Sequence, residues 1–186
     1  MDRLDYAARL EHLRERKQAQ TQAKLRKAGF MDEDDYGQVL PPEDFQWKPT
    51  PNHPNGSFYG LDGWSRNFSS LMENHPVYVD PMDALAGRYM FLLKRMRTPI
   101  WPPEYSYSHL EADQAKYGII HGIGNDAHFA PDYQIGLELG WGGLLEKVRR
   151  CRRQHGPERA AFFQAAEDVI LAIQGWIRRT VAAVAE

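Results

Sequence analysis

The side chains best suited to chemistry lie together in the segment HGIGNDAHFAPDY, residues 121–133. Two imidazoles, His121 and His128, flank an amide and a carboxylate, Asn125 and Asp126, with glycines between them. Imidazole and carboxylate groups can bind metal ions, move protons and orient substrates. The segment is therefore compatible with a metal site, a hydrolytic site, the wall of a substrate pocket or a polar turn.

Metal ligation is the alternative that residue spacing tests most directly. His121 and His128 are seven residues apart. Zinc hydrolases usually place two histidines four residues apart on a helix, or use three ligands with a regular spacing. The sequence therefore predicts no bound metal, and a metal-dependent hydrolase using His121, Asp126 and His128 is the third-ranked interpretation.

Nucleophilic catalysis and phosphate binding are weakly indicated. Cys151 is the single cysteine and stands among four arginines, but no orienting base accompanies it in the sequence. GIGNDAH lacks a phosphate-loop lysine and has Ala127 where a dinucleotide loop has its third glycine. An apolar run, a glycine turn and a Pro-Asp helix start are typical of a strand end that delivers side chains to a pocket. A polar turn bonded to its own backbone is the alternative.

The composition is that of a globular protein, with 42% hydrophobic and 26% charged residues in a chain of 186. A net charge of −2 gives no electrostatic reason to expect nucleic acid or an anionic membrane as partner. The charged N-terminal stretch does not resemble a signal peptide, and no apolar run is long enough to span a bilayer. With a single cysteine, no intramolecular disulfide can form. We therefore expect a cytoplasmic protein.

The chain divides into three regions by composition. Residues 1–30 predict an N-terminal surface helix with a thin apolar face. Residues 31–75 form a proline- and aromatic-rich extended segment, laid over a larger body or packed on this chain's own core. Residues 76–186 form the main helical region.

Within this last region, Asp80 and Pro81 predict a helix start, and an apolar stripe continues to Met96. Residues 118–123 are expected to be extended, and a helix is expected from about Pro131. Four glycines crowd into residues 136–143, for which close approach of another backbone is the simplest reason. A closing helix over 157–184 is apolar on two faces and predicts burial from two sides.

The stretch GNDAHFAPDYQIGLELGWGGLLEKVRR resembles the N-terminal part of glycyl radical enzymes, the pyruvate formate-lyase family. The family pattern is loosely Gly-His, three residues, Asp-Tyr, then Leu-x-x-Gly-x-x-Gly-Leu. Ala127 stands where the pattern has its first glycine. The other positions fall on His128, Asp132, Tyr133, Leu137, Gly140, Gly143 and Leu144. The resemblance is clearest over residues 76–184.

This resemblance implies a mainly α segment, made of the outer helices and a first strand of a ten-stranded β/α barrel. It implies a lyase or dehydratase that cleaves C–C, C–N or C–O bonds of a small organic molecule. Four residues would form the substrate-pocket wall, with His121 as a possible fifth: Gly124, Asn125, Asp126 and His128.

The radical cysteine and glycine of the family have no counterpart in this chain, so no catalytic residue is assigned. The rest of the enzyme chain is the expected partner, as are a second copy in a homodimer and a radical SAM activating enzyme that installs the glycyl radical. No bound cofactor is expected. The alternative function is that of a non-catalytic helical protein that binds a partner.

The ligand spacing generates a first prediction. Purified protein should hold no stoichiometric zinc, iron or manganese, because His121 and His128 lack the spacing of a ligand pair. Elemental analysis by mass spectrometry measures this directly. One tightly held metal equivalent that disappears in His128→Ala would favour the hydrolase.

Overall fold

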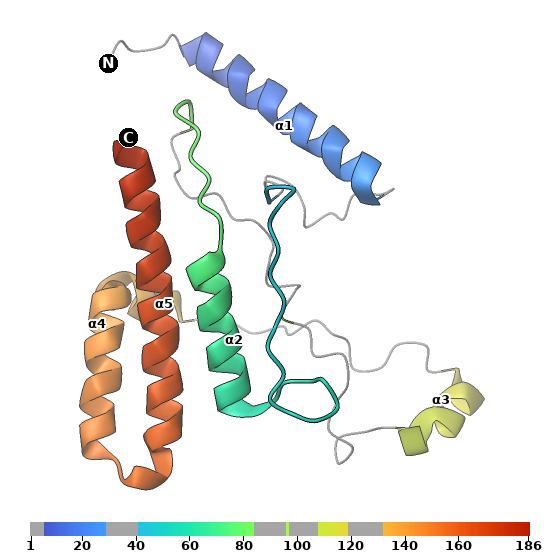
Figure 1. Cartoon of the computed structure of the whole chain (residues 1–186), viewed down its shortest axis with the longest axis vertical. Helices are drawn as coiled ribbons and strands as arrows, with labels where there is room; N and C mark the ends of the chain where they lie inside the picture. The colour runs from blue at the N-terminus through green and yellow to red at the C-terminus, as the bar shows by residue number, and fades with distance from the viewer. Residues whose placement is uncertain (1–5, 29–40, 84–95, 97–107, 119–131) are drawn as a thin grey trace. The chain divides into compact units, whose positions relative to one another are not determined.

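The structure is a computed structural model that describes residues 6–28, 41–83, 96, 108–118 and 132–186. Four α-helices hold most of them: α1 (Tyr6–Ala28), α2 (Gly60–Asn74), α4 (Tyr133–Gln154) and α5 (Ala160–Ala185). The short elements are η4 (Ser108–Leu110), α3 (Glu111–Tyr117) and η5 (Pro157–Arg159) (Figure 1). Of the residues described, 74% are helical and none is in a strand.

The predicted barrel architecture is wrong for this part of the chain. The described residues form helices and contribute neither a sheet nor a barrel wall. The strand was expected at 118–123, of which only Gly118 is described. Gly118 has φ 63° and ψ 30° and ends α3 as a left-handed C-cap, which is a helix terminus and not extended backbone. The long apolar repeats of this chain have helical spacing, and a helical repeat does not suit a strand.

The chain forms two compact units. Unit 1 comprises Met1–Pro49, Ser65–Arg97 and Asp168–Glu186, and unit 2 comprises Thr50–Trp64 and Thr98–Glu167. Helices α2 and α5 each contribute residues to both units. Each unit is therefore described through its own contacts.

In unit 1, the second half of α5 caps the end of α2. Arg179 donates hydrogen bonds to the carbonyl oxygens of Met72, at 2.7 Å, and His75, at 3.1 Å. The last carbonyls of a helix have no partner within it, and a guanidinium supplies donors for them. The buried ring of His75 meets the indole of Trp176 edge-on, with 5.0 Å between ring centroids. This polar and aromatic contact orients α2 against α5.

The proline- and aromatic-rich segment packs on this chain itself at the positions described. In unit 1, the buried Trp47 indole donates to Ser70 Oγ of α2 at 3.2 Å. In unit 2, Phe58 is 1% exposed and meets the ring of Trp64 edge-on, at 5.2 Å. The side chain of Asn52 bonds both the backbone N–H and the carbonyl of Tyr59, which closes the intervening turn. Trp47 and Phe58 therefore belong to the chain's own core.

In unit 2, α4 and the first turns of α5 form an antiparallel hairpin (Figure 1). Arg149 binds Glu167 through Nε and Nη2, at 2.9 and 2.7 Å. Three residues further along α4, Arg152 binds Gln164, which lies three residues earlier on α5. The connection contains η5, and the helical stretch η5–α5 confirms the helix predicted over 157–184.

The capping contact in unit 1 generates a second prediction. Arg179→Ala removes the guanidinium donor from two carbonyl groups at the end of α2 and should lower the free energy of unfolding by about 1–3 kcal/mol. Urea denaturation followed by circular dichroism measures the change. The neighbouring exposed residue supplies the control, since Arg178→Ala should change stability by less than about 0.5 kcal/mol. Equal effects of the two substitutions would show that the cap is not what stabilises this contact.

Candidate functional site

The predicted pocket-wall residues Gly124, Asn125, Asp126 and His128, together with His121, lie outside the described residues. Their assignment therefore stays a prediction from the sequence. The structure does describe the other half of the family-like motif, which begins at Asp132 and runs along α4.

Asp132 is the N-cap of α4. Its Oδ1 accepts a hydrogen bond from the backbone N–H of Ile135 at 3.1 Å, as a capping carboxylate does at the positive end of a helix. The adjacent Tyr133 is 74% exposed, and Leu137, one turn later, is 86% exposed. The aspartate of the motif therefore has a structural role, while two of its apolar positions pack on nothing that the structure describes.

The glycines of α4 serve different purposes. Gly140 has φ 56° and ψ −175°, which divides α4 into two helical pieces and excludes most side chains. A Cβ at Gly136 or Gly142 would meet no described atom within 4 Å, so the predicted close approach of another backbone is not found there. A Cβ at Gly143 would lie 3.0 Å from the Leu139 side chain of the same helix. Conformation, not helix packing, explains the glycine at 140.

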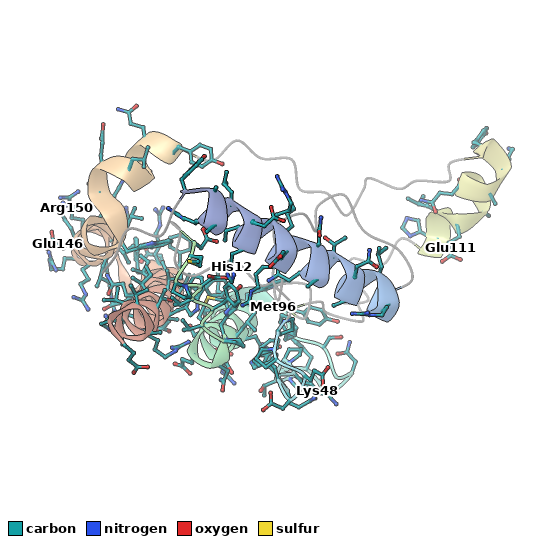
Figure 2. All side chains as sticks on the ribbon, turned by 90° about the horizontal axis from the view of Figure 1, so that it is seen from above. His12, Lys48, Met96, Glu111, Glu146 and Arg150 are labelled. Carbon is teal, nitrogen blue, oxygen red and sulfur yellow. The ribbon has the colours of Figure 1, made fainter. Side chains whose placement is uncertain are left out.

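A second polar constellation lies in unit 1, centred on a buried carboxylate. The side chain of Asp80 is 3% exposed. His12 projects from α1 and places Nε2 3.1 Å from both carboxylate oxygens (Figure 2). One turn along α1, Arg16 Nε lies 3.4 Å from Asp80 Oδ2. Two side chains of one helix therefore meet a single carboxylate that lies 68 residues from His12 in the sequence.

Residues next to Asp80 complete this constellation. The backbone N–H of Met82 donates to Asp80 Oδ1 at 2.9 Å within a turn. Most of the helix predicted to start at Asp80 and Pro81 falls outside the described residues, so the capping role of this aspartate stays a prediction. Arg16 Nη2 donates to the hydroxyl of Tyr78 at 3.0 Å, and that hydroxyl lies 3.4 Å from Asp80 Oδ2. Arg9 donates to the carbonyl oxygen of Met82. We call His12, Arg16, Tyr78 and Asp80 the Asp80 cluster.

The cluster keeps Asp80 ionised. Burial is the largest single influence and raises the pKa of the carboxyl group. The hydrogen bonds from Met82 N–H and His12, with the charges of His12 and Arg16, together outweigh it, so the pKa of Asp80 lies below its ordinary value of 3.8. A carboxylate with a lowered pKa stabilises the contact above its ordinary pKa, and that contribution is lost as the pH falls through the lowered value.

The chemistry of the Asp80 cluster is that of an anchor. A carboxylate beside an imidazole also occurs in hydrolytic triads, but those require a nucleophile within hydrogen-bond reach of the imidazole. The contacts of His12 in the described structure lead to Asp80 and to no hydroxyl or thiol. Across the described ranges, no group of three or more His, Cys, Asp or Glu side chains is arranged to hold a metal ion. The cluster therefore fixes α1 to residues 78–82.

Sequence reasoning missed this cluster, since it assigned residues 1–30 to a solvated surface helix. The available signal was the spacing of Arg9, His12 and Arg16, which recur at steps of three and four and so share one face of a helix. A helix face made only of polar and charged residues shows no hydrophobic periodicity. The sequence therefore did not distinguish this face from one that is exposed to solvent.

Comparison of the chain with protein-family models, with curated proteins and with solved structures finds no match. The likeness to glycyl radical enzymes therefore rests on the motif quoted above. Within the described parts of the chain, no helix has the length and apolar character needed to cross a bilayer.

The glycines of α4 generate a third prediction, and Gly142, two residues after Gly140, supplies its control. Gly140→Ala places a Cβ on a backbone at φ 56° and should lower the free energy of unfolding by about 1–3 kcal/mol. Gly142→Ala adds a methyl group in open space on helical backbone and should raise it by about 0.5–1 kcal/mol. Thermal melts of the two variants measure both effects. A stabilising Gly140→Ala would show that α4 is continuous at this point.

Proposed function

We propose that this chain is the N-terminal segment of a glycyl radical lyase or dehydratase that acts on a small organic molecule. In this proposal it contributes a substrate-pocket wall, and the radical residues belong to polypeptide outside these 186 residues. The observation that carries the proposal is the exposure of the apolar motif positions on α4: Tyr133 is 74% and Leu137 is 86% exposed.

The exposed motif positions are not the only exposed apolar residues of α4. Tyr133 and Leu137 lie four residues apart before the break at Gly140, and Trp141, directly after the break, is 41% exposed. Large apolar side chains gathered on a surface usually mark a binding interface. Two of the three are the positions at which the sequence resembles the enzyme family, so the occupant we propose is the remainder of the same enzyme.

The start of α4 also supports the proposal. In the family-like motif, Asp-Tyr follows the loop that carries the candidate pocket residues, and here Asp132 caps α4 immediately before Tyr133. A capped helix start fixes the direction from which the preceding loop arrives. We propose that Asn125, Asp126 and His128 bind polar groups of the substrate, that Gly124 permits the turn, and that His121 assists.

The activating enzyme, the oligomeric state and the location that we propose are those of the same family. The glycyl radical is installed by a radical SAM activating enzyme, the active enzyme is a homodimer, and its location is the cytoplasm. The chain itself binds no further cofactor in this proposal.

A non-catalytic helical protein that binds a partner is the second candidate. The same exposed residues of α4 favour it, as does Phe162 of α5, which is 53% exposed. The two candidates differ in what the loop at 124–128 does. In the enzyme the loop contacts the substrate, whereas in a binding protein the loop has no role in catalysis.

A fourth prediction separates these functions in the full-length protein. After anaerobic activation by a radical SAM activating enzyme, electron paramagnetic resonance should show a glycyl radical. His128→Ala should leave this signal in place and lower turnover of the active substrate by about 10- to 100-fold, because a misplaced substrate reacts slowly. Small polyols, amines and 2-oxo acids form the substrate panel.

The matched control is His109→Ala, since His109 lies on η4 and is exposed. It should leave both radical and turnover unchanged. A full-length protein with no radical signal, or with equal losses in the two variants, would favour the partner-binding candidate.

A further inference from the structure

Helix α1 is held to unit 1 by polar contacts. No residue of α1 whose side chain the structure describes is buried. Of its large apolar residues that the structure describes, Tyr6 is 72% and Leu10 is 45% exposed, while Leu13 and Leu25 are half-buried. Hydrophobic burial therefore contributes less than it does for a core helix, and charged and hydrogen-bonded contacts provide an important part of the attachment.

These polar contacts converge on one short segment. Arg9 reaches the carbonyl oxygen of Met82, while His12 and Arg16 both reach the carboxylate of Asp80. The three α1 residues span two turns of the helix, and two of the three meet the same carboxylate. Loss of the Asp80 charge removes two of the three contacts at once.

Solvent reaches the two sides of this contact unequally. Asp80 is 3% exposed, but His12 is 35% and Arg16 is 51% exposed. Exposed partners are screened by salt and can exchange their partner for water, so each bond is weak by itself. A helix without a buried face is also only marginally stable in isolation. Attachment of α1 is therefore reversible by modest changes in charge or ionic strength.

We propose that α1 is a detachable arm whose attachment is switched by the charged state and screening of the Asp80 cluster. The groups that face the Asp80 carboxylate are His12 and Arg16 from α1, and Tyr78 and the Met82 N–H from its own segment. The arm is attached while Asp80 is ionised and its partners are unscreened. Neutralising Asp80 or raising the salt concentration releases it and uncovers residues 78–82, while the α4–α5 hairpin stays folded.

The lowered pKa of Asp80 sets the direction of the pH effect. Its stabilising contribution is complete at neutral pH and is lost as the pH falls below 3.8. At neutral pH, salt and substitution are therefore the means of release.

Hydrogen–deuterium exchange of the whole chain at neutral pH tests this proposal. In Asp80→Asn, the amides of α1 should exchange at least about tenfold faster than in the wild type, whereas those of α4 and α5 should remain strongly protected. Raising the salt from 0.02 to about 0.5 M should produce the same pattern in the wild type. Trypsin should then cleave α1 first, at its arginines and lysines.

Glu11→Gln is the matched control, because Glu11 pairs with Arg14 on the exposed side of the same helix, at 2.7 Å. It should leave exchange of α1 unchanged. If Asp80→Asn does not fold, Arg16→Gln removes an exposed partner and should show the same faster exchange in α1. Unchanged exchange of α1 in the folded variant and at high salt would overturn the proposal. Loss of protection in α1, α4 and α5 together would also overturn the proposal, since Asp80 would then stabilise the whole fold and not the attachment of α1 in particular.

Discussion

A buried carboxylate with partners from one helix determines how the N-terminal part of unit 1 is arranged. Asp80 is removed from water, which is unfavourable for a charge unless hydrogen bonds and opposite charges replace the lost solvation. Met82 N–H supplies a local bond, and His12 and Arg16 supply the rest from α1. The position of α1 is therefore a consequence of satisfying this carboxylate and not of burying an apolar face.

At the other end of unit 1, polar groups again decide the arrangement. Arg179 donates to the carbonyl oxygens of Met72 and His75 at the end of α2, and Trp176 packs beside the buried His75. Meanwhile several large apolar side chains of α4 and α5 stay open to solvent, among them Leu137 and Phe162. Apolar area outside a core stabilises nothing until a further surface covers it. Polar contacts thus add to the apolar core in positioning α2 and α5, while some apolar side chains of α4 and α5 stay exposed.

Local signals in the sequence predicted α1, α4 and α5, but missed α2, whose residues 60–74 were assigned to an extended segment, and did not predict the long-range contacts. The helix expected from about Pro131 begins at Tyr133 behind the Asp132 cap, and the helix expected from residue 157 begins with η5, because capping and helix breaking act within one turn. The pairing of His12 with Asp80 spans 68 residues, and no local signal in the sequence identifies Asp80 as the partner of His12. The strand at 118–123 came from the family likeness and a short apolar run, and Gly118 shows that a helix end opens this stretch. Of the candidate site, only the helix that follows the loop is described, so the role of Asn125, Asp126 and His128 stays a prediction.

Two kinds of contact with opposite responses to salt therefore coexist in one chain. The attachment of α1 relies on charge pairs, which weaken as ionic strength rises. The surface around Leu137 and Trp141 is apolar, and association through it does not weaken in the same way, because burying apolar area is insensitive to screening. A change in ionic strength that releases α1 should therefore not weaken an association made through the exposed apolar residues of α4. The two surfaces differ in their physical chemistry, and a substitution at Asp80 should leave the apolar residues of α4 unchanged.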